Sequence, residues 1–157
     1  MYRHFRNKQD ILETVIVERG ESVLAEVRRI VEHASNARQA FDELVLHYAA
    51  ALVANPSLSA VAVYERRTLS PETRALIERL ERLNVEEWVH VLSQVRPELN
   101  DGEARVMVHA ALGMGVAICN YRSGLDDGSL TELVRSMVES ALLRGERAAD
   151  RTVAGRA

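Results

Sequence analysis

The feature that most constrains the fold is the placement of the prolines. The chain of 157 residues has only three, Pro56, Pro71 and Pro97, and each lies beside turn-forming residues. Between them run long segments in which apolar residues recur three or four positions apart, the spacing of one helix face. A run at 60–64 alternates too little to read clearly and could be mistaken for a strand, but it has no second strand candidate to pair with. We therefore expect an all-α fold of about six helices in a single domain.

Local start signals place the individual helices. Polar residues that can cap a helix N-terminus stand before most of the apolar stripes. Residues 100–103 resemble a capping box, and the run from Ser129 to Glu132 matches one. The expected helices run from Lys8 to about His33, through Phe41–Val53, from Leu58 to Leu69, from Pro71 to Pro97, through Val106–Ile118 and through Leu130–Leu142, with caps at Asn7, Asn36, Ser70, Asn100 and Ser129.

The segment from Val106 to Ile118 is apolar on all sides of a helix, apart from His109. Such a helix needs neighbours on opposite faces. We expect one face to meet the core and the other a second subunit, although a central helix in a monomer would also explain the pattern. The final helix carries a stripe of apolar residues on one side only, and we expect this stripe to pair with the same second subunit. The expected homodimer interface comprises Ala110, Gly113, Ala117, Leu130, Leu133, Val134, Met137, Val138 and Ala141.

Composition excludes several classes of protein. The chain is 47% hydrophobic with a net charge of −3, which argues against intrinsic disorder. Its one cysteine, Cys119, rules out an internal disulfide framework and fits a reducing cytoplasm. No secretory signal is apparent, and no apolar run approaches the roughly 20 residues that a membrane span requires. We expect a cytoplasmic protein without a membrane partner.

The sequence contains no motif for catalysis, a phosphate loop or a zinc protease. Glu43 and His47 lie one helical turn apart and could supply two metal ligands, but no third ligand is close in sequence. We therefore expect no catalytic residues, no metal and no cofactor.

A binding cavity is a more plausible expectation than a reaction. Large or polarisable side chains, which line pockets well, fall on apolar faces of the middle helices. Filling the core would explain them equally well. The candidate pocket residues for a small hydrophobic effector are Phe41, Tyr48, Tyr64, Trp88, Met107, Met114 and Asn120.

The first twelve residues, MYRHFRNKQDIL, carry a resemblance. They resemble the end of the DNA-binding domain of the tetracycline-repressor (TetR) family, with its pattern leucine-tyrosine-x-histidine-phenylalanine, two variable residues, lysine, two often acidic residues and leucine. Here Met1 replaces the first leucine. By this resemblance Tyr2, His4 and Lys8 would touch DNA phosphates. The rest of the chain resembles the family's effector-binding and dimerisation domain in helix order and length.

The resemblance implies a division of the chain and a function. Residues 1–8 would be a remnant of the recognition helix, 8–147 the effector-binding and dimerisation domain, and 148–157 a flexible tail. Most of the helix-turn-helix is missing, so we expect specific binding to operator DNA only in a longer parent chain. The implied function is a ligand-responsive, homodimeric transcriptional regulator, expected to be a repressor. The alternatives are a helical protein-interaction or dimerisation module without a small-molecule ligand, and an all-α enzyme using Glu43, His47 or Cys119.

Overall fold

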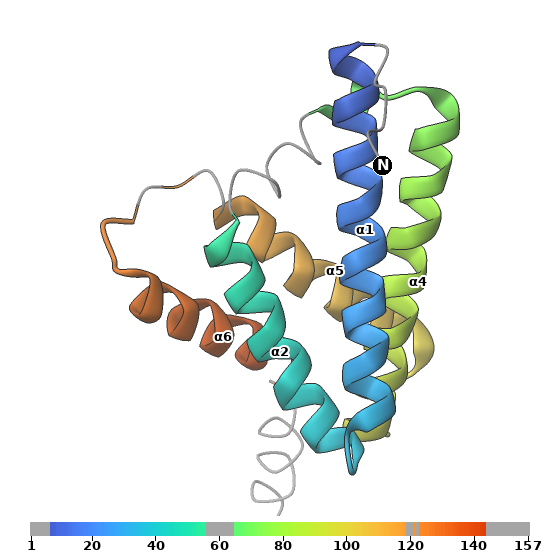
Figure 1. Cartoon of the computed structure of the whole chain (residues 1–157). Coiled ribbons are helices and arrows are strands. Elements are labelled where there is room, and N and C mark those ends of the chain that lie inside the picture. The colour runs from blue at the N-terminus through green and yellow to red at the C-terminus, as the bar shows by residue number, and fades with distance from the viewer. Residues whose placement is uncertain (1–6, 56–64, 119–120, 122, 144–157) are drawn as a thin grey trace, which may run out of the picture.

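The structure is a computed structural model, and it describes residues 7–55, 65–118, 121 and 123–143. The described residues form helices and connecting turns and contain no strand (Figure 1). This confirms the predicted all-α fold. The elements are α1 (Lys8–His33), α2 (Ala37–Ala54), the 3-10 turn η1 (Glu65–Arg67), α4 (Pro71–Val95), α5 (Asp101–Ile118) and α6 (Asp127–Leu143).

Four of the five predicted helix caps form as expected. The side chains of Asn7, Asn36 and Ser70 each accept a hydrogen bond from the backbone N–H three residues later. At α5 the capping box is reciprocal, since Asn100 Oδ1 accepts from the Glu103 N–H at 3.0 Å and Glu103 Oε2 accepts from the Asn100 N–H at 2.9 Å. These bonds satisfy N–H groups that a helix start leaves unpaired, so the caps fix where the helices begin.

Two predicted boundaries were wrong. The final helix starts at Asp127 instead of Leu130, because Asp126 is its cap: the Asp126 carboxylate accepts from the Ser129 N–H at 3.0 Å and from Ser129 Oγ at 2.7 Å. A carboxylate caps at least as well as a serine and also suits the positive end of the helix dipole. The predicted helix over 58–69 does not reach Leu69, since the chain forms only the 3-10 turn at 65–67 before Ser70. Its residues 58–64 lie outside the described part of the chain.

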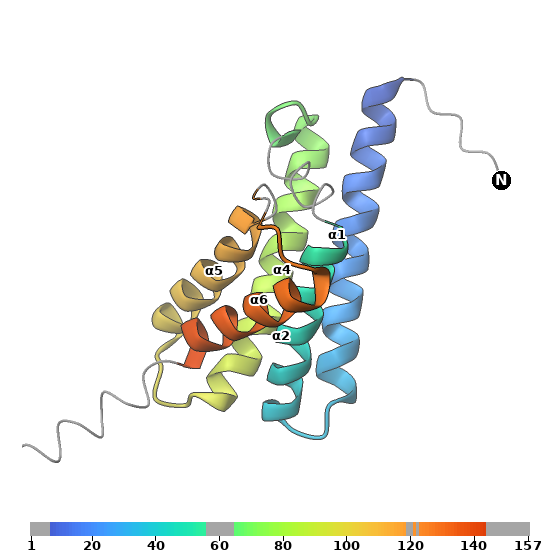
Figure 2. The ribbon, with the colours of Figure 1, turned by 90° about the vertical axis from the view of Figure 1, so that its left-hand side faces the viewer.

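The two longest helices, α1 and α4, lie side by side and run in the same direction (Figures 1 and 2). Helix α2 packs against α1 and α4, α5 packs against α4, and α6 packs against α2 and α5. All five α-helices contribute to the main apolar core that they enclose. A second, smaller cluster of Ile16, Leu69 and Ile77 lies between the first halves of α1 and α4. The molecule is therefore a helical body with one end built only from α1, η1 and α4 among the described elements.

A buried cation joins two helix ends. Arg96, at the end of α4, is almost fully buried, and its guanidinium donates to the backbone carbonyl of Leu142 at 3.0 Å. It also bonds the exposed carboxylate of Glu98 at 2.6 Å. The last turn of α6 has carbonyls without helical partners, and a cation there is favourable. Arg96 thus holds the end of α6 against the end of α4.

Candidate functional site

The predicted interface residues on α5 lie on one side of the helix. Ala110, Gly113 and Ala117 are exposed, together with Val106, whose exposed fraction is 69%. The opposite side of α5, which includes Val108 and Ala111, is buried in the core. The helix that is apolar all round therefore has one face in the core and a second apolar face that no described residue covers.

On helix α6 the predicted set divides between two sides. Leu133 and Met137 are 48% and 39% exposed, and Leu130 and Ala141 are half-buried. Val134 and Val138 are each only 1% exposed, because they pack into the chain's own core. These two valines therefore present no surface to a partner. Fewer of the predicted interface residues on α6 are exposed than the sequence analysis expected. We call Val106, Ala110, Gly113, Ala117, Leu133 and Met137 the outer face; it lies on α5 and α6, which are adjacent in Figure 2.

The structure brings most of the predicted pocket residues together, but inside the core. Phe41 and Trp88 are fully buried, and Met107 and Met114 pack against the same cluster from half-buried positions. Tyr48 meets Trp88 edge to face, with ring centroids 5.9 Å apart and planes at 80°, a favourable aromatic geometry. Tyr64 and Asn120 lie outside the described residues.

Gly115 determines where the Tyr48 ring can lie. A Cβ atom at Gly115 would be 2.2 Å from the Tyr48 hydroxyl oxygen and 2.4 Å from Leu52 Cδ1, so only glycine permits this approach. The Tyr48 hydroxyl donates to the backbone carbonyl of Leu112 on the same helix as Gly115. The only sequence signal for this contact is a glycine within a helix interior, where it is otherwise unfavourable.

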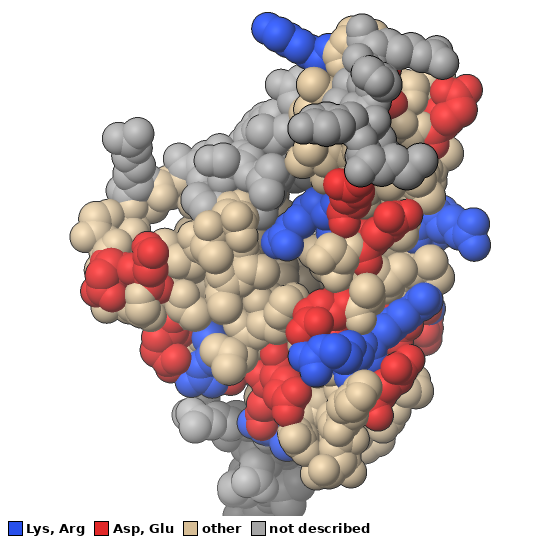
Figure 3. Space-filling model, in the orientation of Figure 1, with Lys and Arg blue, Asp and Glu red and all other residues tan. Residues whose placement is uncertain are grey.

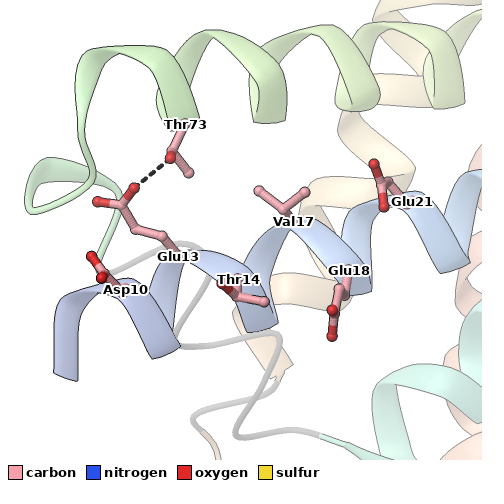
Figure 4. Close-up of a pocket in the computed structure, with 7 residues that line it drawn as sticks. All are labelled: Asp10, Glu13, Thr14, Val17, Glu18, Glu21 and Thr73. Carbon is pink, nitrogen blue, oxygen red and sulfur yellow. Dashed lines mark hydrogen bonds between the residues drawn. The ribbon is translucent and has the colours of Figure 1, made fainter. Parts of the chain in front are cut away.

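Two hollows on the described surface are not lined by the predicted pocket residues. One, of about 400 Å³, lies beside α1 and the start of α4 and is lined mainly by acidic and threonine side chains (Figure 4). The other, of about 590 Å³, lies between α2 and α6 and contains Arg38, Leu46 and Arg135. Charged side chains of both signs are interspersed along α1 (Figure 3), so neither sign dominates that face.

The first hollow contains a carboxylate with several donors that sequence analysis missed. Glu13 on α1 accepts hydrogen bonds from the Ser70 N–H at 2.9 Å, from Ser70 Oγ at 2.8 Å and from Thr73 Oγ1. Gln9 Nε2 donates to it at 3.1 Å. The bond from Thr73, followed by those from Ser70 and Gln9, lowers the pKa of Glu13 from 4.5 to about 2. The carboxylate is therefore ionised at neutral pH and holds the start of α4.

The proposed phosphate contacts and metal ligands have the following positions. Lys8 is exposed at the first turn of α1, while Tyr2 and His4 lie outside the described residues. Burial lowers the pKa of His47. Across the described ranges, no group of three or more His, Cys, Asp or Glu residues is arranged to hold a metal ion.

None of the described helices is long and apolar enough to cross a membrane.

Comparison with known proteins finds similarity at the level of structure. No family model matches the chain, and no curated protein matches it. A TetR-family transcriptional regulator from Bordetella parapertussis 12822 superposes with a TM-score of 0.79 at 18% identity, over 90% of this chain and 74% of that one. The TetR-family regulator PfmR from Thermus thermophilus gives 0.74 at 16% identity, over 88% and 77%. A TetR/AcrR-family regulator from Thermobifida fusca gives 0.71 at 17% identity, over 90% and 76%. The chain therefore has the fold of TetR-family transcriptional regulators, as the resemblance of its first twelve residues predicted.

Proposed function

We propose that this chain is the effector-binding and homodimerisation part of a ligand-responsive transcriptional regulator that acts as a repressor. The observation that carries the proposal is the outer face of α5 and α6 on a fold shared with TetR-family transcriptional regulators. Exposed apolar side chains on two adjacent helices are typical of an interaction surface.

The chemistry of the outer face favours a second copy of the chain as its partner. Its side chains are aliphatic or small, and no charged residue occurs from Val106 to Ile118. Glycine and alanine at 110, 113 and 117 would let two copies of α5 approach closely. Two copies related by a two-fold axis would bury the same residues on both sides, which gives a four-helix interface.

The aromatic and methionine cluster supports a hydrophobic effector. Tyr48, Trp88 and Met114 combine apolar bulk with a hydroxyl, an indole N–H and a flexible thioether, groups that adapt to a ligand. Because Phe41 and Trp88 are already buried, an effector would have to displace packed side chains and so favour a different arrangement of the helices. A ligand acts on the equilibrium only through this difference in affinity.

In the proposed mechanism α1 is the lever between the effector and the DNA. It reaches from the main core to Lys8, the one described residue of the three proposed to touch phosphates. Effector binding would tilt α1 and change the separation of the two DNA-contacting ends in the dimer. Major-groove readers in such dimers must lie about 34–36 Å apart, so a small tilt is sufficient to weaken binding.

A thermal-shift screen with apolar small molecules tests effector binding. A ligand at about 100 times its Kd stabilises a protein by about 2.7 kcal/mol, which for a chain of this size raises the melting temperature by roughly 5–10 °C. Native mass spectrometry of each positive compound should show one molecule per protomer. Absence of any stabilising compound would contradict the effector part of the proposal.

The burial of Phe41 and Trp88 also favours the second candidate, a helical protein-interaction or dimerisation module without a small-molecule ligand. In that case the outer face would still mediate pairing, but no apolar compound would stabilise the chain. The thermal-shift screen therefore distinguishes the two candidates.

A further inference from the structure

Asn84 places a polar side chain in the middle of the buried side of α4. Ile77, Asn84 and Val91 follow one another at intervals of seven residues, so they lie on one side of the helix, and the two apolar members are buried. Asn84 as a whole is half-buried, but its Oδ1 is buried and accepts no hydrogen bond from any described residue. The buried side of a helix is normally apolar, so a buried amide oxygen without a donor is unusual there.

Asn84 lies next to the aromatic and methionine cluster. Leu80, one turn before it, packs against α1, where the Leu80 Cδ1 would be 3.1 Å from a Cβ at Gly20. Trp88, one turn after it, meets Tyr48 of α2 with ring centroids 5.9 Å apart. Four residues rise by about 6 Å along a helix, so Asn84 is one turn from the aromatic pair. It therefore lies on the side of α4 that faces both α1 and α2.

The Tyr48 hydroxyl does not supply the missing donor, because it gives its one proton to the Leu112 carbonyl. Asn84 Oδ1 also differs from Arg74 Nε, the other buried side-chain atom that has no partner among the described residues. Arg74 Nε belongs to a guanidinium that donates through Nη2 to the Leu69 carbonyl at 3.2 Å. A buried acceptor without a donor lowers stability, so a partner that brings an O–H or N–H group to Asn84 would be favoured.

The surroundings of Asn84 favour an uncharged partner. Arg96 is the only charged residue that is buried among those the structure describes, and it already bonds the Leu142 carbonyl and Glu98. It also lies about three turns beyond Asn84 on α4. An ionised group taken into this part of the core would lose its hydration without gaining an opposite charge.

We propose that Asn84 is a specificity-determining residue for the effector, and that its Oδ1 accepts a hydrogen bond from an uncharged, mainly apolar molecule carrying a hydroxyl or N–H group. This inference rests on the proposed effector binding and names the class of effector. The apolar part of the molecule would lie against Trp88 and Tyr48, with its donor directed to Asn84. Hydrocarbons, ethers and carboxylates bring no such donor, so they should bind more weakly than alcohols or amides of the same size.

Two pairs of isomeric probes test this class of effector. 1-Octanol and heptyl methyl ether share one formula, and cyclohexanol and methoxycyclopentane share another, but only the alcohols carry a donor. Titrations of the 157-residue chain, followed by the emission of its single tryptophan, Trp88, give a Kd for each probe. In at least one pair we expect the alcohol to bind the wild type about five- to tenfold more tightly than its isomeric ether.

Variants assign this preference to one side chain. Asn84→Leu should lose the preference for the alcohol and bind the ether at least as tightly as the wild type does. Gln94→Leu, which removes an exposed amide from the same helix, is the matched control and should keep the preference.

A measurement without any probe tests whether the oxygen is unpaired. Asn84→Leu should raise the melting temperature by about 2–6 °C, because it removes a buried acceptor that has no donor. A lower melting temperature would mean that water or another group already pairs with the oxygen, and would overturn the inference.

The titrations also separate this inference from the proposed function. Equal binding of both isomers to the wild type, or a preference for the alcohol that survives in Asn84→Leu, would overturn the role of Asn84 while supporting effector binding. Binding of none of the four probes would overturn the inference, and the effector part of the proposed function would then be decided by the thermal-shift screen.

Discussion

Replacement of Gly115 by alanine tests the packing of α5 against α2 in a way that the neighbouring Gly113 can control. Both glycines lie in the interior of α5, where alanine is preferred by up to about 1 kcal/mol. A Cβ at Gly113 would meet nothing within 4 Å. Gly113→Ala should therefore raise the free energy of unfolding by up to about 1 kcal/mol.

At Gly115 the same propensity gain is opposed by overlap. The new methyl group would lie 2.2 Å from the Tyr48 hydroxyl oxygen and 2.4 Å from Leu52 Cδ1, so both side chains must move. Overpacking of this kind costs about 1–3 kcal/mol. Loss of the Tyr48 hydrogen bond to the Leu112 carbonyl adds about 1 kcal/mol. After the propensity gain is subtracted, Gly115→Ala should lower the free energy of unfolding by about 1–3 kcal/mol.

Urea unfolding followed by circular dichroism measures these changes, at one protein concentration because pairing would contribute to stability. The single tryptophan, Trp88, lies against Tyr48, so its emission should also change in Gly115→Ala and not in Gly113→Ala. Tyr48→Phe removes the nearest clashing atom and should recover part of the loss, giving a favourable coupling in a double-mutant cycle. A Gly115→Ala protein as stable as Gly113→Ala would refute this account of the packing.

Three further predictions concern polar contacts. Arg96→Met leaves the buried Leu142 carbonyl without its charged donor and should lower the free energy of unfolding, measured in urea, by about 2–3 kcal/mol. The control Arg38→Met removes an exposed ion pair with Asp42 and should lower it by less than about 1 kcal/mol. Equal losses in the two variants would contradict the idea that burial makes the Arg96 contact the stronger one. Asp126→Ala removes the cap of α6, so it should lower the free energy of unfolding by about 1 kcal/mol and increase amide exchange in the first turn of α6. Glu132→Ala removes only an exposed ion pair and should lower the free energy of unfolding by at most about 0.5 kcal/mol. A larger loss in Glu132→Ala than in Asp126→Ala would favour the predicted capping box of Ser129 and Glu132 instead. The pKa of Glu13 is lower in the folded chain, so its contribution to stability is complete above about pH 4.5 and is lost as the pH falls toward 2. The difference in unfolding free energy between the wild type and Glu13→Gln should therefore be constant at neutral pH and shrink below about pH 4.5, and a difference independent of pH would argue against an ionised Glu13 in the network.

The parts of the fold that depend on neighbouring residues could be predicted from the sequence. Asn7, Asn36 and Ser70 cap their helices through groups only three residues away, and the same holds for Asn100 and Glu103. The start of α6 was misplaced because two good caps, Asp126 and Ser129, stand close together, and a local pattern does not say which one wins.

The orientation of a helix about its own axis was harder to predict. The stripe on α6 is broad, and the sequence does not show that Val134 and Val138 face the chain's own core while Leu133 and Met137 face outward. The contacts of Glu13 with Ser70 and of Tyr48 with Leu112 join residues 57 and 64 positions apart. Such contacts depend on how the helices are packed, and no spacing within either segment indicates them.

Pairing through the outer face is the central claim, and sedimentation equilibrium of the wild type and Leu133→Glu tests it most directly. The wild type should sediment at twice the chain mass of 17.5 kDa, and Leu133→Glu should sediment at the single-chain mass with unchanged helix content, because a charge would be buried in an apolar interface. Ser22→Glu, which adds the same charge at an exposed position on α1, should remain a dimer. A wild-type chain that stays at the single-chain mass at high concentration, or a Leu133→Glu variant that still pairs, would contradict the account.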